Sequence, residues 1–346
     1  MSERRILLDR GVGEDRGVVL LDGLAERLLI ARAGDDPRER VGARLAARVR
    51  KVEPAFASAF LDIGDGAEAL LGFKPDRRPV EGQMLEVEVR SEPRPGKLAT
   101  VRVVGPSDGK PRLLSVAPDL ATLLKVFAPD AEITVGREAR EAADRAEIEA
   151  MEVVHGLPAG GTISIEPTRA LVAIDVDLGE RKGADAKRLT RQANLAALAA
   201  AARLLRLKGL GGIVVIDLVG RGHDGTALLA AARTAFAPDN PGVAIGPVGR
   251  FGTMELLAPR HGRSVAEILL GPDGRLSEQT LAIRMIRKAQ GEAMQYPGAR
   301  LEGVCSPAVA VLAGPLGEAL CETIGQRFVV RADAGTASVY WEVRRL

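Results

Sequence analysis

Two segments decide the fold, GTISIEPTRALVAIDVDLG at residues 161–179 and GGIVVIDLVGRG at residues 211–222. Alternating and β-branched apolar residues predict buried strands in both segments. Between them, residues 187–207 carry apolar side chains at helical spacing, which predicts one long helix. Each apolar run ends in Ile-Asp, at Asp175 and Asp217. Because the ends of neighbouring strands bring side chains from separate segments together, we expect these two carboxylates to meet.

Carboxylates that converge in this way repel one another, so a cation or a shared proton must offset the repulsion. Oxygen ligands without His or Cys nearby suit Mg²⁺ or Mn²⁺. The alternative interpretation is that each aspartate forms a turn or caps a helix, which is the usual role of a single aspartate after a strand. The pattern leaves both interpretations open at this point.

The composition limits the classes of function. The chain has 346 residues, enough for about two to three domains, and its 48 basic and 46 acidic residues give a formal charge of +2. The net charge is too small to indicate nucleic-acid binding by itself, so any basic surface must be local. Cys305 and Cys321 lie outside any C-x-x-C pair, which argues against a zinc site or a disulfide framework. With no apolar leader and no apolar run of about 20 residues, the sequence predicts a cytoplasmic protein that does not span a membrane.

The N-terminal third predicts a small closed barrel such as an OB-fold, because five short strands alternate with Gly-, Pro- and Asp-rich turns. These strands are residues 43–52, 57–63, 69–73, 84–90 and 97–104. OB-folds bind single strands through stacked aromatic and basic side chains. The candidates are Phe60, Phe73, Arg48, Arg50, Lys51, Lys74, Arg90, Arg94 and Lys97. The alternative is that the phenylalanines fill the barrel core and the cations are only solvated.

The rest of the chain has the pattern of an α/β protein. Residues 119–126, 137–151 and 226–236 predict helices, and residues 277–344 predict a compact α/β module. The long helix at residues 187–207 carries basic residues, among them Arg191, that are candidates for a phosphate-binding edge. For any one of them an exposed surface charge is the more ordinary explanation.

Four motifs together resemble the RNase E/G family of bacterial endoribonucleases, and they occur in that family's order. They are EPAFASAFLDIG at 53–64, LVAIDVD at 171–177, LKGLGGIVVID at 207–217, and RFG at 250–252 followed by Glu255. None of these motifs is specific alone. The resemblance runs through most of the chain and is weakest at residues 106–153.

The resemblance implies an α/β (α+β) fold of several subdomains. These would be the first strands of an RNase H-like subdomain (1–38), an inserted OB-fold barrel that binds RNA (39–105), a connecting RNase H-like segment (106–158), a DNase I-like catalytic subdomain (159–272) and a small C-terminal α/β domain (273–346).

The same resemblance assigns roles to individual residues. It implies that Asp175 and Asp217 hold a catalytic Mg²⁺, and that Asp177 takes the place of the family's phosphate-contacting Asn. It also implies that Phe60 and Lys97 contact RNA on the barrel.

Two regions contain further cationic residues that are candidates for RNA binding and that the resemblance does not assign. Arg250, with Arg191 or Lys182, would donate to phosphate oxygens, and Lys51 joins the RNA-binding candidates of the barrel. The alternative for Arg250 is a structural ion pair with a carboxylate.

The sequence also departs from the family's pattern. Asp177 adds a negative charge where the family has Asn, residues 218–222 lack a further acidic residue, and Leu70 stands near the barrel's second aromatic position. The Arg-Thr pair of the family's five-prime-end sensor and its zinc-binding C-P-x-C segment have no counterpart here. We therefore expect a short form without zinc, and any homodimer would not be zinc-linked.

The resulting prediction is a Mg²⁺-dependent endoribonuclease that hydrolyses single-stranded RNA, such as rRNA precursors or mRNA, in RNA processing or decay. An alternative is an RNA-binding protein that keeps the fold with little or no turnover, which the replacement at Asp177 would favour. A third hypothesis is a ribosome-associated factor that docks on rRNA through the barrel.

Overall fold

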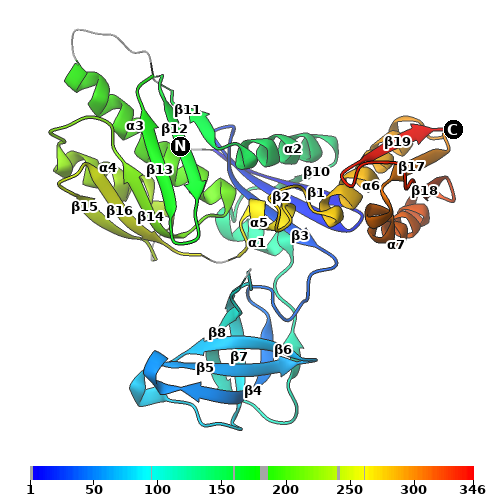
Figure 1. Cartoon of the computed structure of the whole chain (residues 1–346), viewed down its shortest axis with the longest axis horizontal. Coiled ribbons are helices and arrows are strands. Elements are labelled where there is room, and N and C mark those ends of the chain that lie inside the picture. The colour runs from blue at the N-terminus through cyan, green and yellow to red at the C-terminus, as the bar shows by residue number, and fades with distance from the viewer. Residues whose placement is uncertain (1–2, 95, 159, 180–185, 240–241, 261) are drawn as a thin grey trace.

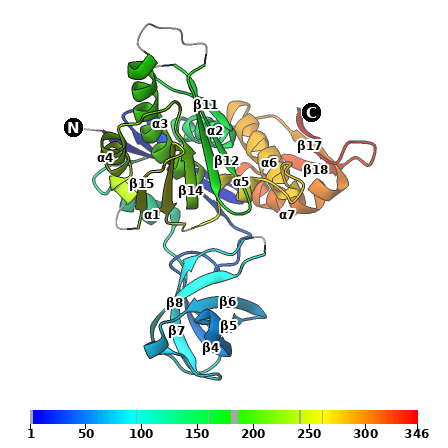
Figure 2. The ribbon, with the colours of Figure 1, turned by 60° about the vertical axis from the view of Figure 1, so that its left-hand side comes forward.

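The described part of the chain consists of four β-sheets, of which all but the barrel have α-helices packed on them. It covers residues 3–94, 96–158, 160–179, 186–239, 242–260 and 262–346 of this computed structural model. Figures 1 and 2 show the same arrangement from two directions. A small barrel stands apart from the remaining sheets, and the C-terminal module lies on the opposite side of the N-terminal sheet from the sheet that contains Asp175 and Asp217. The mixed α/β class that the sequence predicted is confirmed.

The barrel closes because its first strand pairs with both its second and its fourth strand. Around the barrel the strands follow the order β4 (Arg44–Glu53), β5 (Ser58–Gly64), β6 (Ala67–Gly72), β8 (Ala99–Pro106) and β7 (Met84–Ser91). β6 and β8 are parallel and the other pairs are antiparallel, so the barrel is OB-like. Short 3₁₀ turns lie at Pro54–Phe56 and Pro75–Arg77. The sequence missed one strand, β9 (Arg112–Ser115), which joins the edge of β4.

The N-terminal sheet is sandwiched between two helices. Its strand order is β10 (Ile133–Val135), β1 (Arg4–Gly11), β2 (Glu14–Leu21) and β3 (Leu24–Arg32), with β10 parallel to β1. α1 (Leu120–Phe127) packs on one face and α2 (Arg137–Met151) on the other. Gly17 permits the close approach of α1, because a Cβ at this position would lie 2.6 Å from Cδ1 of Leu124.

A six-stranded mixed sheet contains the two segments that decide the fold. Its order is β11 (Val154–Gly156), β12 (Thr162–Pro167), β13 (Val172–Asp177), β14 (Gly212–Asp217), β16 (Thr253–Ala258) and β15 (Ala244–Val248). α3 (Ala186–Lys208) connects the parallel strands β13 and β14, and the chain continues through α4 (Gly225–Ala235), a 3₁₀ turn (Ala237–Asp239) and α5 (Val265–Leu269).

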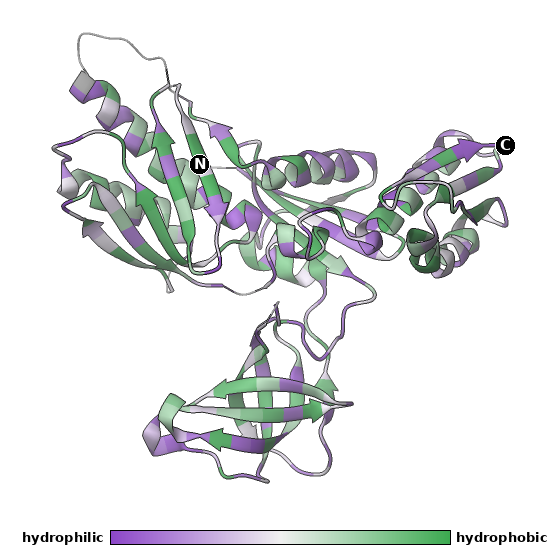
Figure 3. Ribbon diagram, viewed as in Figure 1, coloured by the Kyte–Doolittle hydropathy of each residue, from purple (hydrophilic) through white to green (hydrophobic). Residues whose placement is uncertain are grey.

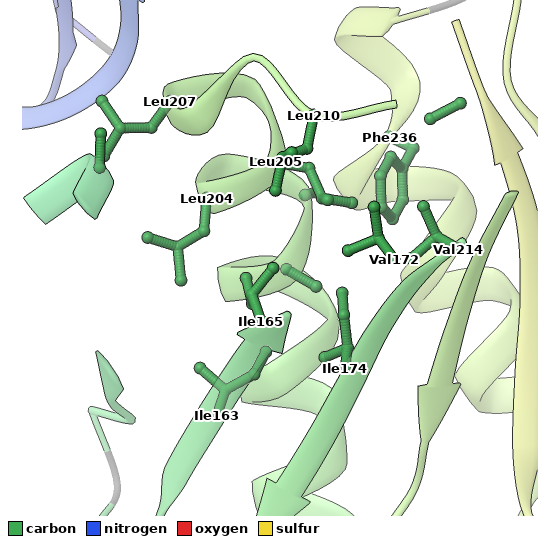
Figure 4. Packing of buried hydrophobic residues seen from close by; sticks show 14 of the residues in the cluster. Ile163, Ile165, Val172, Ile174, Leu204, Leu205, Leu207, Leu210, Val214 and Phe236 are labelled. Carbon is green, nitrogen blue, oxygen red and sulfur yellow. The ribbon is translucent and has the colours of Figure 1, made fainter. Parts of the chain in front are cut away.

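Only one face of this sheet is buried. Ile165, Ile174 and Val214 point toward leucines of α3 such as Leu204 and Leu205, as Figure 4 shows. The alternate residues of β12, β13 and β14 are exposed or half-buried, and the alternation of hydrophobic and hydrophilic residues is visible in Figure 3. The predicted buried strands are thus buried on one face only. Period-two alternation leaves one face open to solvent, and the two aspartates lie on that face.

The C-terminal module is a three-stranded sheet with two helices. The strand order is β18 (Phe328–Ala332), β17 (Leu301–Cys305) and β19 (Trp341–Arg345), and the helices are α6 (Glu278–Gln295) and α7 (Pro307–Ile324). Cys305 and Cys321 are buried free thiols. α7 is long and apolar enough to cross a membrane by length and composition alone, a test that core helices also pass, and it packs on α6 and β18.

A buried ion cluster joins the C-terminal module to the N-terminal sheet. Asp9 on β1 is 2% exposed and accepts hydrogen bonds from Arg16 on β2, at 2.8 and 3.1 Å, and from Arg287 on α6. Arg16 also pairs with Glu147 of α2 at 3.1 Å. Charges this deeply buried are tolerated only when each has a partner, so the cluster fixes how α6 lies against β1 and β2.

Lys208, the last residue of α3, gives a testable dependence of stability on pH. Its ammonium is buried, and it donates hydrogen bonds to the carbonyl oxygens of Ala150, at 2.9 Å, and Glu152 at the end of α2. Burial lowers the pKa of Lys208 from 10.5 to about 8. Between these two pH values the unfolded chain keeps a proton that the folded chain has released, so the free energy of unfolding should rise with pH across this window.

Urea unfolding between pH 8 and 10.5 tests this expectation. The rise should be smaller in Lys208→Met, which has no proton to release at this position. Equal slopes in the two proteins would show that Lys208 keeps its charge in the folded state.

Candidate active site

Asp175 and Asp217 are register partners on neighbouring parallel strands, as the repeated Ile-Asp pattern predicted. Both residues are exposed on the open face of the sheet. Neighbouring strands lie about 4.8 Å apart, so two carboxylates on the same side of adjacent strands can share one ligand. Ser164 pairs with Asp175, and Thr253 pairs with Asp217. The structure therefore places four oxygen-bearing side chains in one row across β12, β13, β14 and β16.

This row has the donor chemistry of a hard cation. Within the described residues, neither Asp175 nor Asp217 has a hydrogen bond or an ion pair to its carboxylate. The same residues contain no group of three or more His, Cys, Asp or Glu side chains arranged to hold a metal. Mg²⁺ often binds through only one or two carboxylates and completes its shell with water and substrate phosphates. Two unpaired carboxylates flanked by hydroxyls therefore fit Mg²⁺ or Mn²⁺, and they do not form a closed protein cage.

Asp177 lies on the same face, two residues beyond Asp175. Its Oδ1 accepts a hydrogen bond of 2.8 Å from the backbone N–H of Gly179. For Asp177 the turn-forming role, which the sequence left open, is therefore present in the structure. One carboxylate oxygen is engaged by the turn, and the negative charge remains near the aspartate pair.

The turn between β15 and β16 lies beside the end of β14. Leu218, which follows Asp217, donates its N–H to the carbonyl of Gly252 at 3.2 Å. Arg250 and Phe251 form the exposed tip, and the Arg250 Cζ lies 4.5 Å from the centre of the Phe251 ring. The alternative of a structural ion pair is wrong within the described residues, because no carboxylate there contacts Arg250.

Arg191 lies on the helix side of the same sheet edge. It is exposed on α3 and lines a pocket of about 640 Å³ together with the segment that follows β14. Lys182, the other cation considered for phosphate binding, lies outside the described residues.

The barrel holds the remaining candidates. Lys51 on β4 and Phe60 on β5 are register partners, and Phe60 is half-buried and outside the barrel core, whereas Phe73 packs on that core. Lys51 forms an ion pair of 2.5 Å with Glu53, and this hydrogen bond raises the pKa of Lys51. Lys97 is exposed in the turn between β7 and β8. The predicted RNA-binding residues thus form two groups, one on the barrel and one at the sheet edge (Figure 1).

Sequence reasoning missed three residues near these groups. Phe56, at the first barrel turn, and Phe251 are 80% and 78% exposed, and His223 lies against Gly252. Both phenylalanines belong to motifs that the sequence singled out, but their exposure depends on turn geometry. The signal that could have predicted this exposure is an aromatic residue near Pro or Gly in a turn, because side chains in turns rarely reach a core.

The middle of the chain is similar in sequence to known ribonucleases. Residues 115–261, which include Asp175, Asp177, Asp217, Arg191 and Arg250, match the model of the Ribonuclease E/G family. The chain is 33% identical over 153 residues to Ribonuclease E of Haemophilus influenzae and 32% identical over 149 residues to Ribonuclease E of Escherichia coli K12. It is also 32% identical over 118 residues to a chloroplastic Ribonuclease E/G-like protein of Arabidopsis thaliana.

These matches cover 40%, 40% and 33% of this chain, and 16%, 14% and 12% of the three relatives. The chain thus matches less than one fifth of the length of each relative. The region that matches the family model, residues 115–261, contains the two aspartate strands, the helix between them and the turn with Arg250. Residues 115–261 of the chain are therefore similar to the Ribonuclease E/G family.

Proposed function

We propose that this protein is an endoribonuclease that hydrolyses single-stranded RNA with a divalent metal ion, Mg²⁺ or Mn²⁺, at Asp175 and Asp217. One observation carries the proposal. Two carboxylates that have no partner among the described residues lie side by side on parallel strands, on an open sheet face, inside the segment that matches the Ribonuclease E/G family.

The residues around this pair suit a phosphodiester substrate. Bound Mg²⁺ would lower the pKa of a coordinated water and neutralise charge that builds on the phosphate. Arg250 extends from the adjacent turn, where its guanidinium can donate to phosphate oxygens. The exposed ring of Phe251 offers a surface on which a base can stack. Asp175 and Asp217 position the reacting groups, and Arg250 and Phe251 hold the strand beside them.

The barrel supplies a second RNA-binding surface. Phe60 and Lys51 lie side by side on its outer face, and Lys97 lies in the turn that precedes β8. OB-like barrels hold single strands by base stacking and by contacts to the backbone charge. The proposed substrates are rRNA precursors or mRNA in the cytoplasm, and a homodimer, if formed, would not depend on zinc.

Cleavage of an end-labelled, single-stranded A/U-rich RNA tests the proposal. Products should appear with Mg²⁺ and should be absent when EDTA replaces the metal. Intact RNA in both lanes, together with a retarded complex on a gel, would instead support the RNA-binding hypothesis. In that case Asp177→Asn, which removes the extra negative charge, is the variant to test for recovered cleavage.

Lys97→Ala tests the role of the barrel. We expect weaker RNA binding and a slope of log K against log salt that is shallower by about 0.7, the value for one lost phosphate contact to a single strand. Binding measured by fluorescence anisotropy at several salt concentrations gives this slope. Lys110→Ala removes an exposed lysine between β8 and β9 and serves as the control. An equal slope in Lys97→Ala and the wild-type protein would remove Lys97 from the RNA-binding surface.

A further inference from the structure

A basic pocket of about 640 Å³ lies at the same sheet edge as the aspartate pair, on the side of the helices. We propose that this pocket is a phosphate subsite, which binds a phosphodiester group of the RNA strand at a nucleotide next to the one that is cleaved. The inference rests on the proposed function, because it takes the strand at Asp175 and Asp217 to be RNA. The sequence offered Arg191 as a phosphate-binding candidate, but the pocket and its other cations become visible only in the structure.

The charges that line the pocket are unbalanced. α3 contributes Lys187 and Arg191, and the segment after β14 contributes Arg221. All three side chains are exposed, and none has an ion pair with another described residue. The lining also contains Asp224, but its carboxylate accepts a hydrogen bond of 3.1 Å from the N–H of Ala227 and caps α4. Three cations therefore line the pocket against one carboxylate, which leaves an excess of positive charge.

The walls of the pocket are fixed to the end of the catalytic strand. Asn194 on α3 is 1% exposed, donates to the carbonyl of Val219 at 3.0 Å and accepts from the Val219 N–H at 3.1 Å. Gly220 has a φ of +91°, and a Cβ there would lie 2.6 Å from Cγ2 of Thr190. The segment after Asp217 is thus held tightly against α3, and Arg221 starts from a fixed backbone.

His223 adds a polar atom that has no protein partner. Its Nε2 is buried and makes no hydrogen bond to any described residue. The same atom would lie 3.1 Å from a Cβ on Gly252, so the ring stands between the pocket and the turn that carries Arg250. Because Nε2 is buried against the Gly252 turn, the ring forms a wall of the pocket, and its environment should change when a ligand fills the pocket.

The chemistry and the position favour a phosphate of the strand. Arginine forks match the oxygens of phosphate, and the exposed Arg191, Arg221 and Lys187 supply several donors with no base-specific pattern. Arg221 follows Asp217 by four residues, which span at most about 14 Å. A strand of a few nucleotides that crosses the edge at Asp217 therefore reaches the pocket.

Binding of a non-cleavable single-stranded 2′-O-methyl RNA to the full chain in EDTA tests the inference. Arg191→Ala and Arg221→Ala should each weaken binding by roughly 3- to 10-fold and make the salt slope shallower by about 0.7. Arg233→Ala removes an exposed arginine from α4 outside the pocket and should leave the slope unchanged. An unchanged slope in Arg191→Ala and Arg221→Ala would overturn the inference.

Imidazole NMR signals identify the ligand. The chain has three histidines, and the His223 signal should shift when the RNA is added, whereas that of the buried His155 should not. If inorganic phosphate at equal phosphate concentration shifts His223 and the RNA does not, the pocket binds a free phosphate and the inference is wrong. A separate cleavage assay distinguishes the two proposals. Loss of binding in the pocket variants without wild-type cleavage would refute only the proposed function, and cleavage with unchanged slopes would refute only the subsite.

Discussion

Asp217→Asn should lower the rate of metal-dependent RNA cleavage by at least about 100-fold, equivalent to about 2.7 kcal/mol of transition-state stabilisation. The substitution keeps the shape of the side chain and removes one of the two charges that would hold the metal. Asp217 is exposed at the end of β14 and its carboxylate has no described partner, so the fold should not change. Single-turnover cleavage of an end-labelled RNA measures the effect.

Two controls make this result specific. Glu166→Gln removes a charge from the same open face, on β12 two strands from Asp217, and should cleave at the wild-type rate. RNA affinity of Asp217→Asn in EDTA should stay within about twofold of the wild type, because the barrel is unchanged. If Asp217→Asn cleaves as fast as the wild-type protein, the aspartate pair is not the catalytic site.

Asp9→Ala should lower the free energy of unfolding by about 3–5 kcal/mol. The change leaves Arg16 and Arg287, which are 4% and 9% exposed, close together without the carboxylate between them. Removing one partner from a buried ion cluster costs more than the cluster itself contributes, because the remaining charges stay desolvated. Trp341 is the only tryptophan, and it lines the same cavity as Arg16 and Arg287, so its fluorescence during urea unfolding reports on this junction.

Glu138→Ala is the matched control for Asp9→Ala. Glu138 on α2 forms an ion pair of 2.7 Å with Arg5 on β1, so this pair joins the same sheet and helix. Both side chains are about half exposed. An exposed pair contributes about 0–1 kcal/mol. Equal urea midpoints for the two variants would mean that water reaches the Asp9 cluster and screens it.

The sequence was sufficient for elements whose pattern is local. The five barrel strands, α3 and the pairing of Asp175 with Asp217 follow from alternation, helical spacing and repeated strand ends. β9, β10, β11 and β16 were missed, because short edge or hairpin strands carry few residues and take their form from the strand that they join. The subdomain families and their boundaries stay predictions.

Contacts between segments that are far apart in the chain could not be predicted from the sequence. Asp9 and Arg287 are 278 positions apart, and no local pattern connects a carboxylate on β1 with an arginine on α6. The same holds for Asn194 and Val219, whose contact needs the loop after β14 to fold back on α3. The sequence also did not predict the exposure of Phe56 and Phe251. Phe is usually buried, and only the conformation of the turns directs these rings into solvent.

The barrel is inserted in the sequence between β3 and β10 of the N-terminal sheet, and this insertion sets the order in which the chain can fold during synthesis. β1, β2 and β3 emerge first, but β10, which pairs with β1 in parallel, emerges only after the whole barrel. The five barrel strands are contiguous in sequence and can close while the N-terminal sheet still lacks its fourth strand and both covering helices. Arg287 emerges later still. On the ribosome, the unfinished sheet therefore depends longest on protection from misfolding.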